Sequence, residues 1–175
     1  MSETLETIRN RRSCRAYKPD PISEDELRKI IEAGTYAATG MGKQSPIIIA
    51  VTNRELRDRL SAMNAKIMGQ GPEFDPFYGA PTVLVVLANR AIPTYQYDGS
   101  LVMGNLMLAA AELGVGSCWI HRAKEEFESE EGKEILKSLG IEGDYEGIGH
   151  CILGYEAAPS KEAAPRKENY VYYIR

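Results

Sequence analysis

The stretch of residues 101–113 constrains the fold more than any other part of this chain. Its apolar members are Leu101, Val102, Met103, Leu106, Met107, Leu108 and the alanines at positions 109–111. In a helix they would cover nearly the whole circumference, and a helix that is apolar all round must be buried on all sides. In a chain of 175 residues, this predicts that part of the helix lies at a subunit interface. We expect Asp98 or Ser100 to cap the helix, and Gly114 and Gly116 to end it.

Short β-branched runs and helical patterns alternate along the rest of the chain. The expected strands span residues 47–51, 83–87, 117–120 and 148–153. The expected helices span residues 2–10, 23–38, 53–67 and 129–139. Ser23 and Glu26 form a capping box, and Asn53 is an N-cap. Residues 170–174 are again strand-like and could pair with the edge of their own sheet or of a partner's. The pattern predicts a mixed α/β arrangement in one domain, residues 1–175.

Composition and charge argue against several classes of protein. The formal net charge is −4 and 43% of the residues are hydrophobic, which supports a real core and disfavours a nucleic-acid-binding domain, since such domains are basic. The longest apolar run, residues 83–88, is too short to cross a membrane, and the acidic N-terminus does not read as a signal peptide. Three widely spaced cysteines, Cys14, Cys118 and Cys151, indicate reduced, packed thiols in the cytoplasm. The two histidines show no metal-ligand spacing, so we expect no metal.

A cluster of cations lies where the first expected helix ends. Arg11, Arg12 and Arg15 surround Ser13, and two prolines downstream forbid further helix. Guanidinium forks and a hydroxyl suit a phosphate, which accepts several converging hydrogen bonds. The alternative interpretation is a cationic helix end on a solvated face. The chain has neither a dinucleotide fingerprint nor a Walker phosphate loop, so the cluster predicts a site for a small anion.

Several motifs, taken in order, resemble the nitroreductase family of flavoenzymes. They are Arg11-Arg12-Ser13-Cys14-Arg15-Ala16-Tyr17, Gln44-Ser45-Pro46, Asn64, Asp98-Gly99-Ser100 with the apolar helix after it, Gly114-Val115-Gly116 followed by Cys118-Trp119-Ile120, Gly149 to Tyr155, and Pro165-Arg166-Lys167. The resemblance covers nearly the whole chain. Two positions depart from the usual family pattern: Gly42 stands where many relatives have Asn, and His121-Arg122 where many have a glycine pair.

The resemblance implies an α+β fold with a central, mostly antiparallel sheet flanked by helices. It implies an intertwined homodimer, with FMN at the subunit interface and the C-terminal strand added to the partner's sheet. The implied activity uses NAD(P)H as co-substrate and reduces a nitroaromatic, quinone or similar small-molecule acceptor by a two-half-reaction, ping-pong hydride mechanism. The alternatives are ene reduction, reductive dehalogenation or flavin breakdown, or a flavin-binding module without turnover. No nucleic acid or membrane is expected as a partner.

The resemblance also assigns residues to the cofactor. Arg11, Arg166 and Lys167 would hold the phosphate, and Arg12 and Ser13 would contact the phosphate, ribityl chain or ring edge. Arg15 would lie by the flavin pyrimidine near N1, where a cation stabilises the reduced form. The remaining assignments are Asn64 to the polar edge of the ring, the backbone of Ile120, His121 and Arg122 to N5, and Gln44 to the partner subunit's cofactor. The alternatives are an exposed polar residue for Asn64 and a surface residue for His121; His150 is expected to be structural. No protein residue is assigned as a catalytic group, because the flavin carries the hydride.

Overall fold

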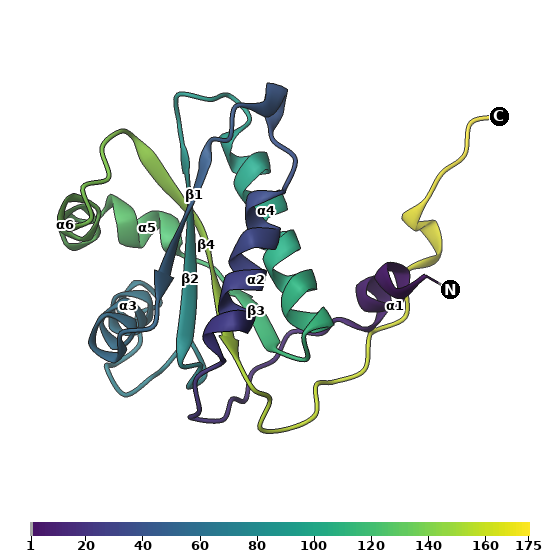
Figure 1. Ribbon diagram of the computed structural model, residues 1–175, viewed down its shortest axis with the longest axis horizontal. Helices are drawn as coiled ribbons and strands as arrows, with labels where there is room; N and C mark the ends of the chain where they lie inside the picture. The colour runs from purple at the N-terminus through teal and green to yellow at the C-terminus, as the bar shows by residue number, and fades with distance from the viewer. Residues whose placement is uncertain (1) are drawn as a thin grey trace.

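A four-stranded antiparallel sheet forms the centre of the computed structural model, which describes residues 2–175 (Figure 1). Its strands are β1 (Pro46–Val51), β2 (Thr82–Asn89), β3 (Gly116–Ile120) and β4 (Tyr145–Gly154), in the order β1-β2-β4-β3. Each neighbouring pair is antiparallel. The four strands expected from β-branched runs are therefore confirmed, although β4 begins before the expected residue 148.

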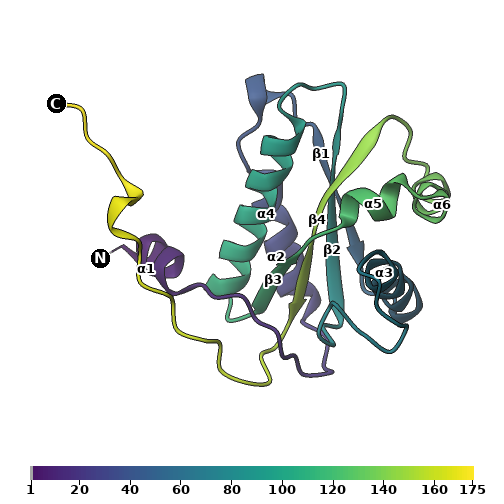
Figure 2. The same cartoon turned by 180° about the vertical axis from the view of Figure 1, so that it is seen from behind.

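Helices cover both faces of the sheet, as the front and back views show (Figures 1 and 2). One face carries α2 (Glu24–Thr35) and α4 (Tyr95–Glu112), and the other carries α3 (Arg54–Ile67), α5 (Ala123–Glu128) and α6 (Glu130–Ser138). Successive side chains of a strand point to opposite faces. Along β2, Val83, Val85 and Leu87 accordingly pack into one core, while Leu84 and Val86 pack into the other. This double burial explains why β2 is a continuous apolar run.

Local sequence signals correctly place two helix starts. At α2 the Ser23 side chain accepts a hydrogen bond from the Glu26 backbone N–H, and the Glu26 side chain accepts one from the Ser23 backbone N–H, so the capping box is confirmed. Asn53 likewise accepts a bond from the Leu56 backbone N–H, at 2.9 Å, and caps α3. The sequence missed α5, which has only 6 residues and no side-chain cap, and follows Arg122 in a left-handed conformation.

The predicted cap of α4 is wrong. The helix begins at Tyr95, and Asp98 lies inside its first turns, where only 2% of Asp98 is exposed. The Asp98 carboxylate accepts hydrogen bonds from the Gly40 backbone N–H at 2.9 Å, the Ser45 hydroxyl at 2.7 Å and the Thr94 hydroxyl at 3.0 Å. Burial opposes ionisation of Asp98, yet these three bonds hold the pKa of its carboxyl below the usual range. Asp98 therefore anchors the loop that contains η1 (Gly40–Gly42) instead of capping a helix.

Only one side of α4 is buried within the chain. Val102, Met103, Leu106 and Ala110 pack into the core between α4 and the sheet. Leu101, which lies on the other side, is 50% exposed. A helix that is apolar all round needs cover on every side, and this chain covers only one side of α4. The position of α4 at a subunit interface stays a prediction.

The strand expected at residues 170–174 is not part of the chain's own sheet. Tyr170 closes the 3-10 segment η2 (Glu168–Tyr170), and residues 171–174 are exposed and extended beyond it. Figure 1 shows the C-terminal tail passing beside α1 (Glu3–Asn10) and then running away from the rest of the molecule. Pairing with a partner's sheet stays a prediction. Among residues 2–175, no helix combines the length and apolar character that a membrane span requires.

Candidate functional site

The arginine cluster lies in an extended segment that follows α1 and runs beside β3. The Cys14 backbone N–H donates to the Ser117 carbonyl at 2.9 Å, and the Lys18 N–H donates to the Tyr155 carbonyl at 2.9 Å. The segment is thus joined to β3 and to the chain that leaves β4. Arg11 and Ser13 are partly exposed and Arg15 is exposed, while Cys14 between them is buried.

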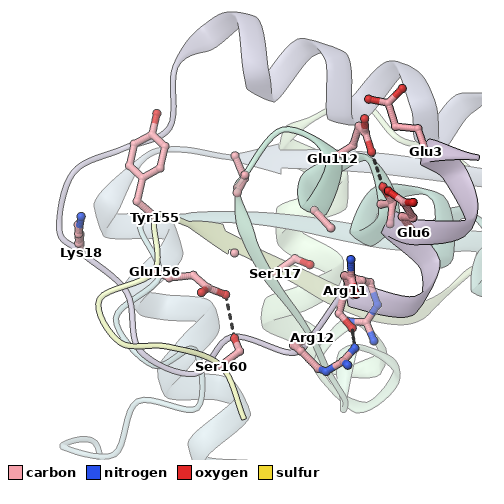
Figure 3. A pocket seen from close by; sticks show the side chains of 16 residues that line it. Glu3, Glu6, Arg11, Arg12, Lys18, Glu112, Ser117, Tyr155, Glu156 and Ser160 are labelled. Carbon is pink, nitrogen blue, oxygen red and sulfur yellow. Dashed lines mark hydrogen bonds between the residues drawn. The ribbon is translucent and has the colours of Figure 1, made fainter. Parts of the chain in front are cut away.

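A groove of about 710 Å³ opens beside this segment (Figure 3). It lies between α1, the turn that joins α4 to β3, and residues 155–160. The cations Arg11, Arg12 and Lys18 line it together with the carboxylates of Glu3, Glu6, Glu112 and Glu156. Two of these carboxylates accept hydrogen bonds from hydroxyl groups: Glu112 from Thr7, and Glu156 from Ser160 at 2.8 Å.

Two residues that line this groove each carry a buried polar atom that has no hydrogen-bond partner among residues 2–175. The atoms are Nη1 of Arg11 and Oγ of Ser117. A buried donor without a partner is rare in folded proteins, and each such atom requires an explanation. A guanidinium N–H and a hydroxyl are both donors that an anion can accept from. The chemistry of these two donors suits a compact anion, such as a phosphate.

A second groove, of about 390 Å³, adjoins the first. Ser13, Arg15, Ala16 and residues 158–162 line it, and it shares Arg12 and Ser160 with the first groove. Arg12 is partly engaged, because its Nη1 donates to the carbonyls of Arg9 at 2.6 Å and Arg11 at 2.7 Å. The structure therefore places four predicted site residues, Arg11, Arg12, Ser13 and Arg15, along two connected grooves.

Three more predicted site residues meet at the turn after β3: Asn64 of α3, Ile120 at the end of β3, and His121. Asn64 is completely buried, so the alternative of an exposed polar residue is wrong. Its amide nitrogen donates to the His121 carbonyl at 2.8 Å, and its oxygen accepts from Nε of Arg122 at 3.1 Å. Ile120 is buried, whereas the His121 side chain is exposed. Asn64 thus contacts the backbone turn that the resemblance places opposite N5.

Gln44 lies far from the arginine grooves of its own chain. It is exposed, has a φ of 50°, and belongs to the loop that Asp98 anchors near the start of α4. Glu112, at the other end of this 18-residue helix, lines the first groove. At about 1.5 Å of rise per residue, Asp98 and Glu112 are roughly 20 Å apart along the helix. One chain therefore does not bring Gln44 and Arg11 together.

Arg166 and Lys167 also stand apart from the grooves. Both are exposed in the C-terminal tail, and neither lines a groove described above. Arg166 donates to the Ala164 carbonyl at 2.6 Å, and the Lys167 ammonium lies 5.4 Å from the centre of the Tyr170 ring.

The three cysteines pack in the interior, as the sequence predicts. All are free and buried. Burial raises the pKa of the Cys14 thiol, and it raises the pKa of Cys151 to about 12. A thiol that stays protonated is a poor nucleophile. Sequence reasoning missed Ser117 as a site residue, because a serine in a short strand carries no signal until its neighbour across the bridge, Ser13, is known.

Residues 8–155 match the sequence model of a family described as the nitroreductase family. The chain belongs to the nitroreductase family. It is 31% identical over 160 residues to a protein of Archaeoglobus fulgidus with the provisional name NADH dehydrogenase/NAD(P)H nitroreductase, and the match covers 89% of this chain and 86% of that protein.

Two solved nitroreductase structures cover the whole chain. One, from Bacteroides fragilis with bound FMN, is 31% identical with a TM-score of 0.89, and the other, from Desulfitobacterium hafniense with bound FMN, is 27% identical with a TM-score of 0.87. In both comparisons 100% of each chain is covered. The predicted α+β nitroreductase fold is confirmed.

The unpaired hydroxyl of Ser117 makes a prediction about stability. In the cofactor-free protein, Ser117→Ala should leave the free energy of unfolding unchanged or slightly raised, because the lost hydroxyl has no partner. The matched control is Ser61→Ala. The buried Ser61 hydroxyl donates to Asp75 at 2.6 Å, so this change should cost roughly 1.5–3 kcal/mol. Urea unfolding measures both, and an equal loss in the two variants would show that Ser117 has a partner after all.

Proposed function

We propose that this protein is an FMN-dependent NAD(P)H oxidoreductase that reduces a nitroaromatic, quinone or similar small-molecule acceptor. One observation carries the proposal: the two buried donors without a partner, on Arg11 and Ser117, lie in a groove beside Arg12, Ser13 and Arg15. Full-length likeness to two nitroreductases with bound FMN supports the same reading.

The donor set fits the phosphate of a mononucleotide. Arg11 and Ser117 would supply hydrogen bonds, and Arg12 and Ser13 would add further donors. Arg166 and Lys167 would join them from the tail. The carboxylates of Glu3, Glu6, Glu112 and Glu156 also line the groove, and they would repel a second phosphate. This charge pattern favours FMN over FAD.

The protein's own residues would set the chemistry of the bound cofactor. When bound, FMN supplies the hydride chemistry that links NAD(P)H to the acceptor in two successive half-reactions. Arg15 would place a positive charge at the pyrimidine side, which favours the electron-rich reduced form. The backbone of residues 120–122, held by Asn64, would present a fixed surface to N5, and the exposed His121 would lie next to the acceptor.

The site needs a second chain in this proposal. Exposed apolar side chains lie along α1 and α4, among them Leu5 at 52%, Ile8 at 51% and Leu101 at 50% exposure. Monomers rarely expose large apolar patches, so we assign this side of the molecule to a homodimer interface. Gln44, which lies far from the grooves of its own chain, would then reach the cofactor of the partner subunit.

Two coarser assignments accompany this function. We take residues 1–175 as one nitroreductase-like domain, because β2 contributes to both cores and leaves no linker between them. We place the protein in the cytoplasm, because free, buried thiols such as Cys14 and Cys151 suit a reducing compartment.

The first test asks whether the protein carries FMN and is reduced. The purified protein should be yellow and release FMN on heating, as chromatography of the released cofactor would establish. NADH or NADPH should bleach the colour under anaerobic conditions. FAD as the sole product would refute the site assignment, and a flavin that neither reductant bleaches would refute the oxidoreductase.

Arg11 and Arg15 should fail differently when each is replaced by alanine. A charge-assisted hydrogen bond contributes about 1.5–3 kcal/mol, so Arg11→Ala should weaken FMN binding by roughly ten- to a hundredfold and leave riboflavin, which lacks the phosphate, nearly unaffected. Arg15→Ala should weaken both flavins alike and make the bound flavin harder to reduce. Flavin titrations and midpoint potentials measure these effects.

Arg54→Ala is the matched control for these two variants, because Arg54 is an exposed cation on α3, paired with Asp58. It should change neither flavin affinity nor the potential. The roles assigned to the two arginines are wrong if Arg11→Ala weakens riboflavin as much as FMN, or if Arg15→Ala leaves the potential unmoved.

Removal of residues 165–175 should weaken FMN binding and the dimer together. The truncation deletes Arg166 and Lys167 as well as the strand-like residues 170–174, which we place on the partner's sheet. The double variant Arg166→Ala/Lys167→Ala separates the two effects: it should weaken FMN and leave the dimer intact. Flavin titration and sedimentation at low concentration measure both properties. If the truncated chain binds FMN with unchanged affinity and forms an equally strong dimer, the tail has neither of these roles.

A further inference from the structure

Three completely buried polar side chains from three different elements meet behind the turn that follows β3. They are Asn64 of α3, Glu126 of α5 and His150 of β4, each with 0% exposure. Oε1 of Glu126 accepts from the Asn64 amide at 2.5 Å, and Oε2 lies 3.0 Å from Nε2 of His150. The Glu126 carboxylate is therefore the centre of this buried network.

Within residues 2–175, every other hydrogen bond of these three side chains goes to residues 120–122. Asn64 donates to the His121 carbonyl at 2.8 Å and accepts from Nε of Arg122 at 3.1 Å. Nδ1 of His150 lies 3.4 Å from the Ile120 carbonyl. Three consecutive residues, 120–122, are thus tied to one buried carboxylate through Asn64 and His150.

The turn adopts a conformation that needs such support. Arg122 has a φ of 78°, in the left-handed region that non-glycine residues rarely occupy. Behind it, a Cβ at Gly147 would lie 2.2 Å from the Ala123 carbonyl oxygen, so the backbone of β4 packs directly against the chain after the turn. A non-glycine residue held in this region signals a conformation that the surrounding structure imposes, and such residues cluster at functional sites.

We propose that Glu126 is a positioning residue: through Asn64 and His150 it fixes the backbone of residues 120–122 in the place that the reaction requires. The proposal rests on the function proposed above, in which this backbone faces N5 of FMN. Glu126 is fully buried and touches neither groove, so it acts on the site only through its two partners. A displacement of about 1 Å at a reacting centre is enough to slow a reaction by about a hundredfold.

Three substitutions at Glu126 separate this role from general stabilisation. Glu126→Ala removes the centre of the network and leaves the Asn64 amide and the His150 ring without their partner. Glu126→Asp keeps the charge, but its side chain is too short to bond both Asn64 and His150. If the alanine variant does not fold, the aspartate variant is measured in its place. Glu126→Gln keeps both hydrogen-bonding positions, because its amide oxygen accepts from Asn64 and its nitrogen donates to Nε2 of the His150 tautomer that carries its proton on Nδ1. Glu125→Ala, at an exposed position of the same helix, is the matched control.

The decisive measurement is the rate of flavin reduction in a single turnover at saturating NAD(P)H, with the FMN-loaded protein. Glu126→Ala and Glu126→Asp should slow it by roughly ten- to a hundredfold, with little change in FMN affinity, because the phosphate donors lie elsewhere. Glu126→Gln and Glu125→Ala should stay close to the wild-type rate. A folded alanine or aspartate variant that reduces flavin at the wild-type rate would overturn the proposal, and so would a glutamine variant as slow as alanine.

A second readout needs no cofactor. Amide hydrogen exchange at residues 121–123 should be faster in FMN-free Glu126→Ala than in wild type, and Glu126→Gln should restore it. Unchanged exchange in the alanine variant would mean that Glu126 does not hold the turn. If wild-type protein does not bind or reduce flavin, the proposed function fails, while this exchange experiment still decides whether Glu126 positions the turn.

Discussion

The burial of β2 on both faces is the constraint on which the rest of the structure depends. Because Val83, Val85 and Leu87 pack into one core and Leu84 and Val86 into the other, helices must cover both sides of the sheet. In the strand order β1-β2-β4-β3, β2 and β4 are the two internal strands and neither is an open edge. The edge that remains beside β4 is β3, and there the segment after α1 pairs through Cys14 and Ser117. The arginine cluster is thus carried to a fixed edge of a rigid sheet.

Within the part of the chain that the structure describes, buried polar groups beside β3 lack hydrogen-bond partners that buried polar groups elsewhere have. Buried polar groups elsewhere are matched: the Asp98 carboxylate accepts from three donors, and the buried side chains of Arg57 and Ser61 both donate to Asp75. Among residues 2–175, the buried side-chain atoms without a partner are on Arg11 and Ser117, and both line one groove. Two unpaired buried donors in one groove require an explanation, and a bound anion that accepts hydrogen bonds from both of them provides it.

Sequence patterns predicted those structural features that depend only on residues close to one another in the sequence. The capping box at Ser23 needs only Glu26, and the strands need only a run of β-branched residues, so these predictions are confirmed. The arginines and Ser13 fall within five positions of the sequence, and the structure places them along two adjoining grooves. These features could be predicted because their partners lie within a few residues or because the backbone geometry alone fixes them.

Features that depend on distant partners could not be predicted in this way. Asp98 resembles a helix cap until Gly40 and Ser45 are seen to donate to it, and those partners lie 58 and 53 residues away. Asn64 and Glu126, 62 residues apart, gave no sign that they meet. The short helix α5 begins at a left-handed residue that no sequence rule favours.

The apolar helix α4 connects the fold to the site. Its inner side completes the core, and its two ends hold the two halves of the proposed site: Asp98 anchors the loop with Gln44, and Glu112 lines the groove with Arg11. In a twofold dimer each contact occurs twice, with the roles of the subunits exchanged. If the outer sides of two α4 helices pack in antiparallel fashion, the start of each helix lies beside the end of the other. The length of α4, which keeps Gln44 away from the groove of its own chain, would then bring it to the groove of the partner subunit. Dimer formation and cofactor binding would consequently depend on the same apolar surface.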